Sequence, residues 1–153
     1  MNDDMKRYLF LLIFFAAALY MHAQGPEVVI PAPYSYELHD GIYSYSDEPF
    51  IRFKRVSDKK VCAEGYVMTM TLEGVTVMTS SDAGEFYALQ TLRQMTRDGE
   101  IKEICCCEIT DAPRFPYRGM HFDVSRHFRS VDFLKKQIDA MAMFKMNRMH
   151  IRV

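Results

Sequence analysis

The sequence has no excess of charge of either sign and no tryptophan. Its 153 residues include 19 Lys and Arg against 20 Asp and Glu, a formal net charge of −1. Proteins that hold nucleic acid or an acidic membrane surface through their overall charge carry a marked positive excess. We therefore expect no nucleic acid among the partners of this protein. Apolar residues make up 49% of the chain, which is enough for one folded core.

The sequence also lacks an apolar run long enough to span a membrane comfortably. Lys6 and Arg7 precede the uncharged run YLFLLIFFAAALY at residues 8–20, whereas a spanning helix needs about 20 apolar residues. Ala23 is a small residue shortly after this run, as at a signal-peptide cleavage site. We expect residues 1–23 to be a signal peptide, with a retained N-terminal anchor as the weaker alternative. The protein is then secreted or periplasmic, with no membrane attachment after cleavage.

Cysteines are few, and their spacing suits neither a disulfide framework nor a metal site. The four are Cys62, Cys105, Cys106 and Cys107. Neighbouring cysteines of an extended strand point to opposite faces, so they do not pair easily with one another. A zinc site would need spaced ligands such as C-x-x-C. We expect the cysteines to be small buried strand residues and expect no metal, although a bridge from Cys62 to one of the other three stays open.

Between residues 24 and 112, short β-rich segments surround one helical segment. Prolines, alternating polarity and turn residues mark these segments, and the first of them has the features of an edge strand and turn. Residues 65–72 and 75–79 flank Glu73-Gly74, which predicts a hairpin. The expected strands are 28–41, 43–46, 50–56, 65–72, 75–79 and 101–110.

The helical segment of this region covers residues 84–97. Ser80-Ser81-Asp82 provides capping chemistry before it, and Asp98-Gly99 ends it. Its expected apolar stripe consists of Phe86, Ala88, Leu89, Leu92 and Met95. Together the segments predict a small α+β domain of residues 24–112, whose mostly antiparallel sheet is covered by the helix on one face.

The pattern changes over residues 113–153. Residues 119–125 alternate in polarity as a short strand does, Ser130 can cap a helix, and a second strand begins at Met149. The apolar face of the helix consists of Leu134, Ile138, Met141 and Ala142. Strand, helix and strand in this order predict a β-α-β unit of a parallel sheet or barrel, and one such unit cannot close a barrel.

Charged side chains gather where the first of these strands ends. Parallel α/β architectures place binding groups at the carboxyl ends of their strands, and Arg126 follows that end. Its planar guanidinium offers several donors to adjacent sugar hydroxyls and keeps its charge. The residues alone slightly favour the alternative that Arg126 only pairs with a carboxylate such as Asp123. We expect Arg114 and Arg118 to brace the turn between the two regions, and His121 to be a satisfied core histidine.

Residues 111–128, DAPRFPYRGMHFDVSRHF, resemble the entrance to the catalytic barrel of the glycoside hydrolase family 20 β-N-acetylhexosaminidases. The helix around residues 138–142 and the sequence KMNRMH at residues 145–150 follow in the same order. Upstream, EGYVMTM at residues 64–70 and GEFYALQTLRQM at residues 84–95 are similar to the small noncatalytic α/β domain that precedes this barrel. The likeness covers roughly residues 26–153 and includes several motifs in order, which makes it specific. It implies that residues 113–153 are the first β-α-β unit of a truncated (β/α)8 TIM barrel.

The resemblance implies an exo-acting enzyme that hydrolyses terminal β-linked N-acetylglucosamine or N-acetylgalactosamine with retention of configuration. In this family the acetamido oxygen of the substrate attacks the anomeric carbon, an Asp orients the acetamido group, and a Glu acts as general acid and base. The resemblance places the substrate-binding arginine at Arg126. It implies glycans with β-linked N-acetylhexosamine as partners, and no cofactor, because the substrate supplies the nucleophile.

The sequence departs from the family pattern near Val153. Ile151 and Arg152 follow His150, where the family usually continues with Trp-His-Leu, and the catalytic Asp–Glu pair is expected beyond residue 153. We therefore expect no catalytic residue within these 153 residues and no hexosaminidase activity of this chain alone. Two alternatives stay open. One is a noncatalytic carbohydrate-associated or interaction module with a vestigial barrel, and the other is a different glycosidase that shares the leading domain.

Overall fold

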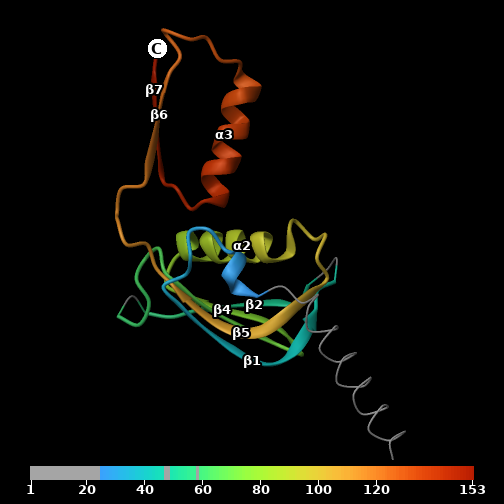
Figure 1. Cartoon of the computed structure of the whole chain (residues 1–153). Helices are drawn as coiled ribbons and strands as arrows, with labels where there is room; N and C mark the ends of the chain where they lie inside the picture. Colours follow the sequence, from blue (N-terminus) through green and yellow to red (C-terminus); the bar gives the residue numbers. More distant parts are fainter. Residues whose placement is uncertain (1–24, 47–48, 58) are drawn as a thin grey trace, which may run out of the picture.

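The computed structural model of the protein describes residues 25–46, 49–57 and 59–153. The expected signal peptide, residues 1–23, lies outside these residues, as does Asp47-Glu48 of the expected break before the second strand. No helix among the described residues is long and apolar enough to cross a membrane. These residues form a five-stranded sheet crossed by one helix, followed by a two-stranded sheet with a second helix (Figure 1).

The first sheet has the strand order β1-β5-β3-β4-β2. Only β2 and β4 pair in parallel, whereas the other neighbouring strands are antiparallel. Helix α2 (Asp82–Thr96) lies across one face of the sheet, and the short 3-10 helix η1 (Pro26–Val28) contacts it (Figure 1). The strands are β1 (Ser35–Ser44), β2 (Ile51–Arg55), β3 (Tyr66–Thr71), β4 (Gly74–Thr79) and β5 (Glu103–Asp111). The predicted α+β domain is confirmed.

Strand β1 is an edge strand, as predicted, but it is one strand where two were expected. It pairs with β5 on both sides of a register shift between Leu38 and Ile42. Gly41 lies in this bulge with a φ of +114°, a backbone angle that favours glycine because glycine has no Cβ atom. The glycine therefore bends the strand, where the sequence pattern predicted that the strand would end.

Strands β3 and β4 form the predicted hairpin, with the turn one residue earlier than expected. The turn residues are Leu72 and Glu73, and Gly74 is the first residue of β4. A Cβ atom at Gly74 would lie 2.8 Å from the backbone oxygen of Phe50. The N–H of Val75 donates to that same oxygen at 3.1 Å. Gly74 thus allows the close approach of the chain that leads into β2.

Helix α2 begins at Asp82, two residues before the expected start, and one of the expected capping residues caps it. Ser81 is the N-cap, and its hydroxyl accepts a hydrogen bond from the N–H of Gly84 at 3.3 Å. The stripe residues that are buried are Ala88, Leu92 and Met95. Phe86 is 44% exposed, so its prediction as a core residue is wrong. The buried face includes Thr91 instead, whose hydroxyl is 2.5 Å from that of Tyr66, and apolar periodicity cannot reveal a buried threonine.

The four cysteines are free thiols. Cys106 and Cys107 are buried in β5 and Cys105 is half-buried there, as predicted for small strand residues. Cys62 is exposed in the connection before β3, so its prediction as a buried strand residue is wrong. Burial raises the pKa of the Cys107 thiol to about 12, which keeps this thiol protonated at neutral pH.

The predicted strand–helix–strand unit is confirmed. It consists of β6 (Gly119–Asp123), α3 (Val131–Met143) and β7 (Arg148–Arg152), with β6 and β7 parallel. The hydroxyl of Ser130, the N-cap of α3, accepts a hydrogen bond from the N–H of Phe133 at 3.3 Å. On the apolar face of α3, Met141 is buried but Ile138 is 51% exposed. Two strands therefore cover only part of this face.

The two faces of the β6–β7 sheet differ in polarity. Phe122 faces α3, where its ring meets that of Phe133 edge to face at a centroid distance of 6.2 Å. Side chains alternate along a strand, so the register partners His121 and His150 lie on the opposite face, with ring centroids 4.6 Å apart. His121 is exposed, so its prediction as a core histidine is wrong. The reason is that α3 covers only the other face.

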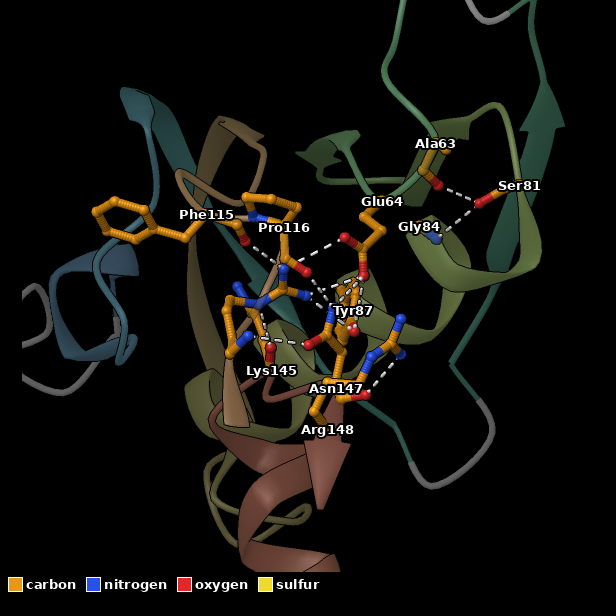
Figure 2. A network of polar contacts seen from close by, with 11 residues as sticks. Ala63, Glu64, Ser81, Gly84, Tyr87, Phe115, Pro116, Lys145, Asn147 and Arg148 are labelled. Atoms are coloured by element: carbon orange, nitrogen blue, oxygen red, sulfur yellow. Dashed lines mark hydrogen bonds and ion pairs between the residues drawn. The ribbon is translucent and has the colours of Figure 1, made fainter. Parts of the chain in front are cut away.

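Arg118 connects the start of β6 to the five-stranded domain, through partners that are labelled in Figure 2. Its guanidinium donates to both carboxylate oxygens of Glu64, at 2.9 and 3.2 Å, and to the hydroxyl of Tyr87 at 3.0 Å. It also donates to the carbonyls of Phe115 and Lys145. Five acceptors thus match the five N–H groups of the side chain. The predicted bracing role of Arg118 is confirmed.

Lys145 forms a second connection between the two regions. It follows α3 with a φ of +58°, and its ammonium donates to Asp111 at 2.6 Å and to the hydroxyl of Tyr66 at 3.0 Å. The side chains of Lys145 and Asp111 are only 8% and 12% exposed. Burial lowers the pKa of Lys145, and the charge of Asp111 opposes this shift. Both connections lie at the amino-terminal ends of β6 and β7.

Candidate functional site

The candidate site lies at the opposite, carboxyl ends of β6 and β7. The two strands end at the register partners Asp123 and Arg152. Arg126 follows three residues after Asp123, in the connection to α3. The parallel pairing of the strands therefore brings one carboxylate and two guanidinium groups together at one edge of the sheet.

Asp123 organises the chain that leaves β6. One of its carboxylate oxygens accepts hydrogen bonds from the hydroxyl of Ser125 at 2.9 Å and from the backbone N–H of Arg126 at 3.0 Å. The backbone hydrogen bond from Arg126 and then the hydroxyl of Ser125 hold the pKa of Asp123 below its usual value. Asp123 is therefore a carboxylate at neutral pH and sets the position of Arg126 along the chain.

The side chain of Arg126 is 72% exposed and pairs with Asp123, with 3.4 Å between Nε and Oδ2. A guanidinium nitrogen of Arg152 lies 3.7 Å from the same oxygen. The ion pair is the contact that the alternative interpretation of Arg126 predicted. The pair is long and its guanidinium is open to solvent, so water and salt screen it and it contributes little to stability. The guanidinium of Arg126 can therefore exchange this partner for another acceptor at little cost.

These groups can bind a polar ligand, but they do not form a general acid–base pair. Arginine stays protonated, and Asp123 with its lowered pKa stays ionised, so neither delivers a proton near neutral pH. Among the residues that the structure describes, no group of three or more His, Cys, Asp or Glu side chains could hold a metal ion. The site is thus equipped to donate hydrogen bonds.

Sequence reasoning identified Arg126 but did not include Arg152 in this site. The available signal was the pairing of the two predicted strands, because a parallel register brings their last residues together. Arg114, which was expected to brace the turn, is exposed and lies on the wall of a pocket at the other end of the strands. The role of Arg126 in substrate binding stays a prediction.

Comparison with known proteins agrees with the order of the two regions. Residues 43–112 match domain 2 of glycosyl hydrolase family 20, and residues 115–153 match the catalytic domain of the same family. The chain belongs to glycoside hydrolase family 20. A β-hexosaminidase of Porphyromonas gingivalis is 43% identical over 96 residues, which are 57% of this chain and 12% of that protein. A β-hexosaminidase of Akkermansia muciniphila is 36% identical over 131 residues, 82% of this chain and 25% of that protein.

A solved structure supports the family 20 fold. A variant β-hexosaminidase of Streptomyces plicatus, in complex with the product GlcNAc, superposes with a TM-score of 0.72 at 26% identity. The match covers 80% of this chain and 34% of that one. The chain also spans a quarter or less of the length of the two curated relatives. It therefore contains the domain that precedes the family 20 barrel, and the start of that barrel.

Proposed function

We propose that this chain is the N-terminal part of an exo-acting β-N-acetylhexosaminidase. The enzyme removes terminal β-linked N-acetylglucosamine or N-acetylgalactosamine from glycans by substrate-assisted, retaining hydrolysis. The catalytic Asp–Glu pair comes from later strands of the barrel, outside these residues. The charged and apolar pattern of residues 6–23 supports action outside the cytoplasm.

The observation that carries the proposal is the position of Arg126 in a family 20 barrel entrance. Arg126 follows the carboxyl end of β6, is mostly exposed, and is positioned by the backbone hydrogen bond to Asp123. Binding groups of (β/α)8 enzymes lie at this end of the strands. The guanidinium presents several donors in one plane, which suits two adjacent hydroxyls of a terminal sugar. Arg126 is therefore the proposed substrate-binding residue, and no catalytic residue is assigned.

A chimera tests this proposal. Residues 24–153 replace the matching segment of the Akkermansia muciniphila β-hexosaminidase, which is 36% identical, and the remaining barrel comes from that enzyme. The chimera is expected to hydrolyse 4-nitrophenyl N-acetyl-β-D-glucosaminide. Arg126→Ala should lower kcat/KM by about 10- to 100-fold, because it removes charge-assisted hydrogen bonds to the sugar.

Arg129→Ala is the matched control. Arg129 lies in the same exposed connection, where its guanidinium lies 5.1 Å from the centre of the Phe133 ring, so its loss should leave kcat/KM within about twofold. An Arg126→Ala chimera as active as the parent would remove Arg126 from the substrate site. Turnover by the 153-residue chain alone would contradict the assignment of the Asp–Glu pair to later strands.

A further inference from the structure

A pocket of about 280 Å³ lies where the five-stranded domain meets the β6–α3–β7 unit. Its wall includes Arg118, which directly precedes β6, whereas Arg126 follows the far end of that strand. The volume lies just below the usual range for ligand pockets, about 300–1,000 Å³. The space therefore suits one ring-sized ligand.

Aromatic rings line this pocket and are open to solvent at its edge. Tyr34 is 72% exposed and Phe115 is 68% exposed, whereas Tyr87 is buried beside them. The ring of Phe115 projects away from the polar network (Figure 2). Exposed aromatic rings offer flat apolar surfaces with a negative face, on which the C–H groups of a ligand can stack.

The buried and half-buried charged groups of the pocket carry no net charge, whereas Arg114, which also lines it, is exposed and adds one positive charge. Two carboxylates, Glu64 and Asp111, are paired with two cations, Arg118 and Lys145, in ion pairs of 2.9 and 2.6 Å. A phosphate would meet both carboxylates, and a metal ion would meet both cations. A purely apolar ligand would take these charges out of water without replacing their solvent contacts. A neutral ligand with hydroxyl groups avoids all three costs.

Some hydrogen-bonding capacity of these groups is left for a ligand. The ammonium of Lys145 has three N–H groups, of which two donate to Asp111 and Tyr66. In the described part of the chain, Oδ1 of Asp111 accepts from the N–H of Tyr34 at 3.2 Å and has a second lone pair. One donor and one acceptor therefore lie side by side next to the aromatic rings. A sugar hydroxyl can both accept and donate, so it matches this pair.

We propose that this pocket binds one neutral sugar residue of a glycan, a hexose or an N-acetylhexosamine. The apolar face of the sugar ring stacks on Tyr34 and Phe115, and its hydroxyls bond to Lys145 and Asp111. The site lies at the amino-terminal ends of β6 and β7, so it is separate from the carboxyl-end residues around Arg126. It does not depend on the proposed hydrolase activity.

Titration of the isotope-labelled 153-residue chain with GlcNAc and with glucose, followed by NMR amide shifts, tests this inference. Saturable shifts at residues 32–34 and 112–115 are expected, with a Kd on the order of 1 mM, as suits a single small ligand. Tyr34→Ala and Phe115→Ala should each weaken binding by about tenfold. Both residues are exposed, and unchanged amide spectra away from the pocket will show that the variants fold.

Two control variants separate this site from the other end of the strands. Phe128→Ala removes an aromatic residue that is 87% exposed, and Arg129→Ala removes a guanidinium from the same connection; neither should change the Kd read from residues 32–34 and 112–115. Loss of binding in either control would overturn the pocket assignment, as would full binding by Tyr34→Ala and Phe115→Ala. The absence of amide shifts with both GlcNAc and glucose would also overturn the assignment. Tighter binding of glucose 6-phosphate than of glucose would identify an anion site instead.

Discussion

In the five-stranded domain, Met68, Met70 and Ile109 are 0% exposed under α2. In the β6–α3–β7 unit, Ile138 on the helix is 51% exposed and Ile151 on the second strand is 39% exposed. Both regions have a helix with an apolar face over strands with alternating side chains. The difference is that five strands span the width of a helix and two do not. Whether an apolar side chain is buried therefore depends on how many strands lie under the helix. The apolar pattern of the helix or strand alone does not decide it.

The largest expected effect is a loss of stability on truncating an apolar side chain, and it should differ between the two regions. Ile109→Ala should destabilise the protein by about 4 kcal/mol, because it leaves a cavity at a fully buried site. Ile138→Ala, at a half-exposed site, should cost less than about 1 kcal/mol. Urea unfolding followed by far-UV circular dichroism measures both, since the chain has no tryptophan. Equal losses at the two positions would mean that the unit is as well packed as the domain.

The next effect concerns the attachment of one region to the other. Lys145→Met removes the cation from a pair whose side chains are 8% and 12% exposed, and leaves Asp111 buried without its partner. This should cost about 3 kcal/mol. The double variant Lys145→Met/Asp111→Asn should regain most of that loss in the same unfolding experiment, because no buried charge remains. If the double variant were as unstable as Lys145→Met alone, an unpaired buried charge would not be the cause of the loss.

The smallest effect is a pH dependence at the Arg118–Glu64 pair. Hydrogen bonds from Arg118 lower the pKa of Glu64 from its ordinary value of 4.5. A depressed carboxyl pKa contributes stability above pH 4.5 and loses it as the pH falls through the folded-state pKa. The stability difference between the native chain and Glu64→Gln, about 1 kcal/mol at pH 7, should therefore shrink at pH 3. A constant difference between these pH values would exclude this pair as the titrating group.

Much of the secondary structure could be predicted because its causes are local. Ser81 and Ser130 cap the two helices where the sequence places a hydroxyl before a helical pattern. The hairpin and the parallel unit followed from alternation and turn residues. The errors at Phe86 and His121 have one physical origin. Periodicity shows that a residue can face a core, but a second layer must be present to bury it.

The partners of the junction could not be predicted in the same way. Lys145 lies at the end of a predicted helix, and its hydrogen-bond partners Asp111 and Tyr66 are 34 and 79 residues away in sequence. Glu64, the partner of Arg118, lies just before a predicted strand and is 54 residues from it. No local pattern connects such positions. The pocket between the two regions has the same origin, because both contribute its wall.

The sequence by itself determined the order of helices and strands, their caps and turns, and the membership of family 20, because these depend on neighbouring residues and on motifs in order. The tertiary structure alone decided which apolar faces are covered, which charges are paired at the junction, and that Arg152 lies beside Asp123 and Arg126. These features depend on contacts between residues far apart in the chain, which form only when the layers pack together.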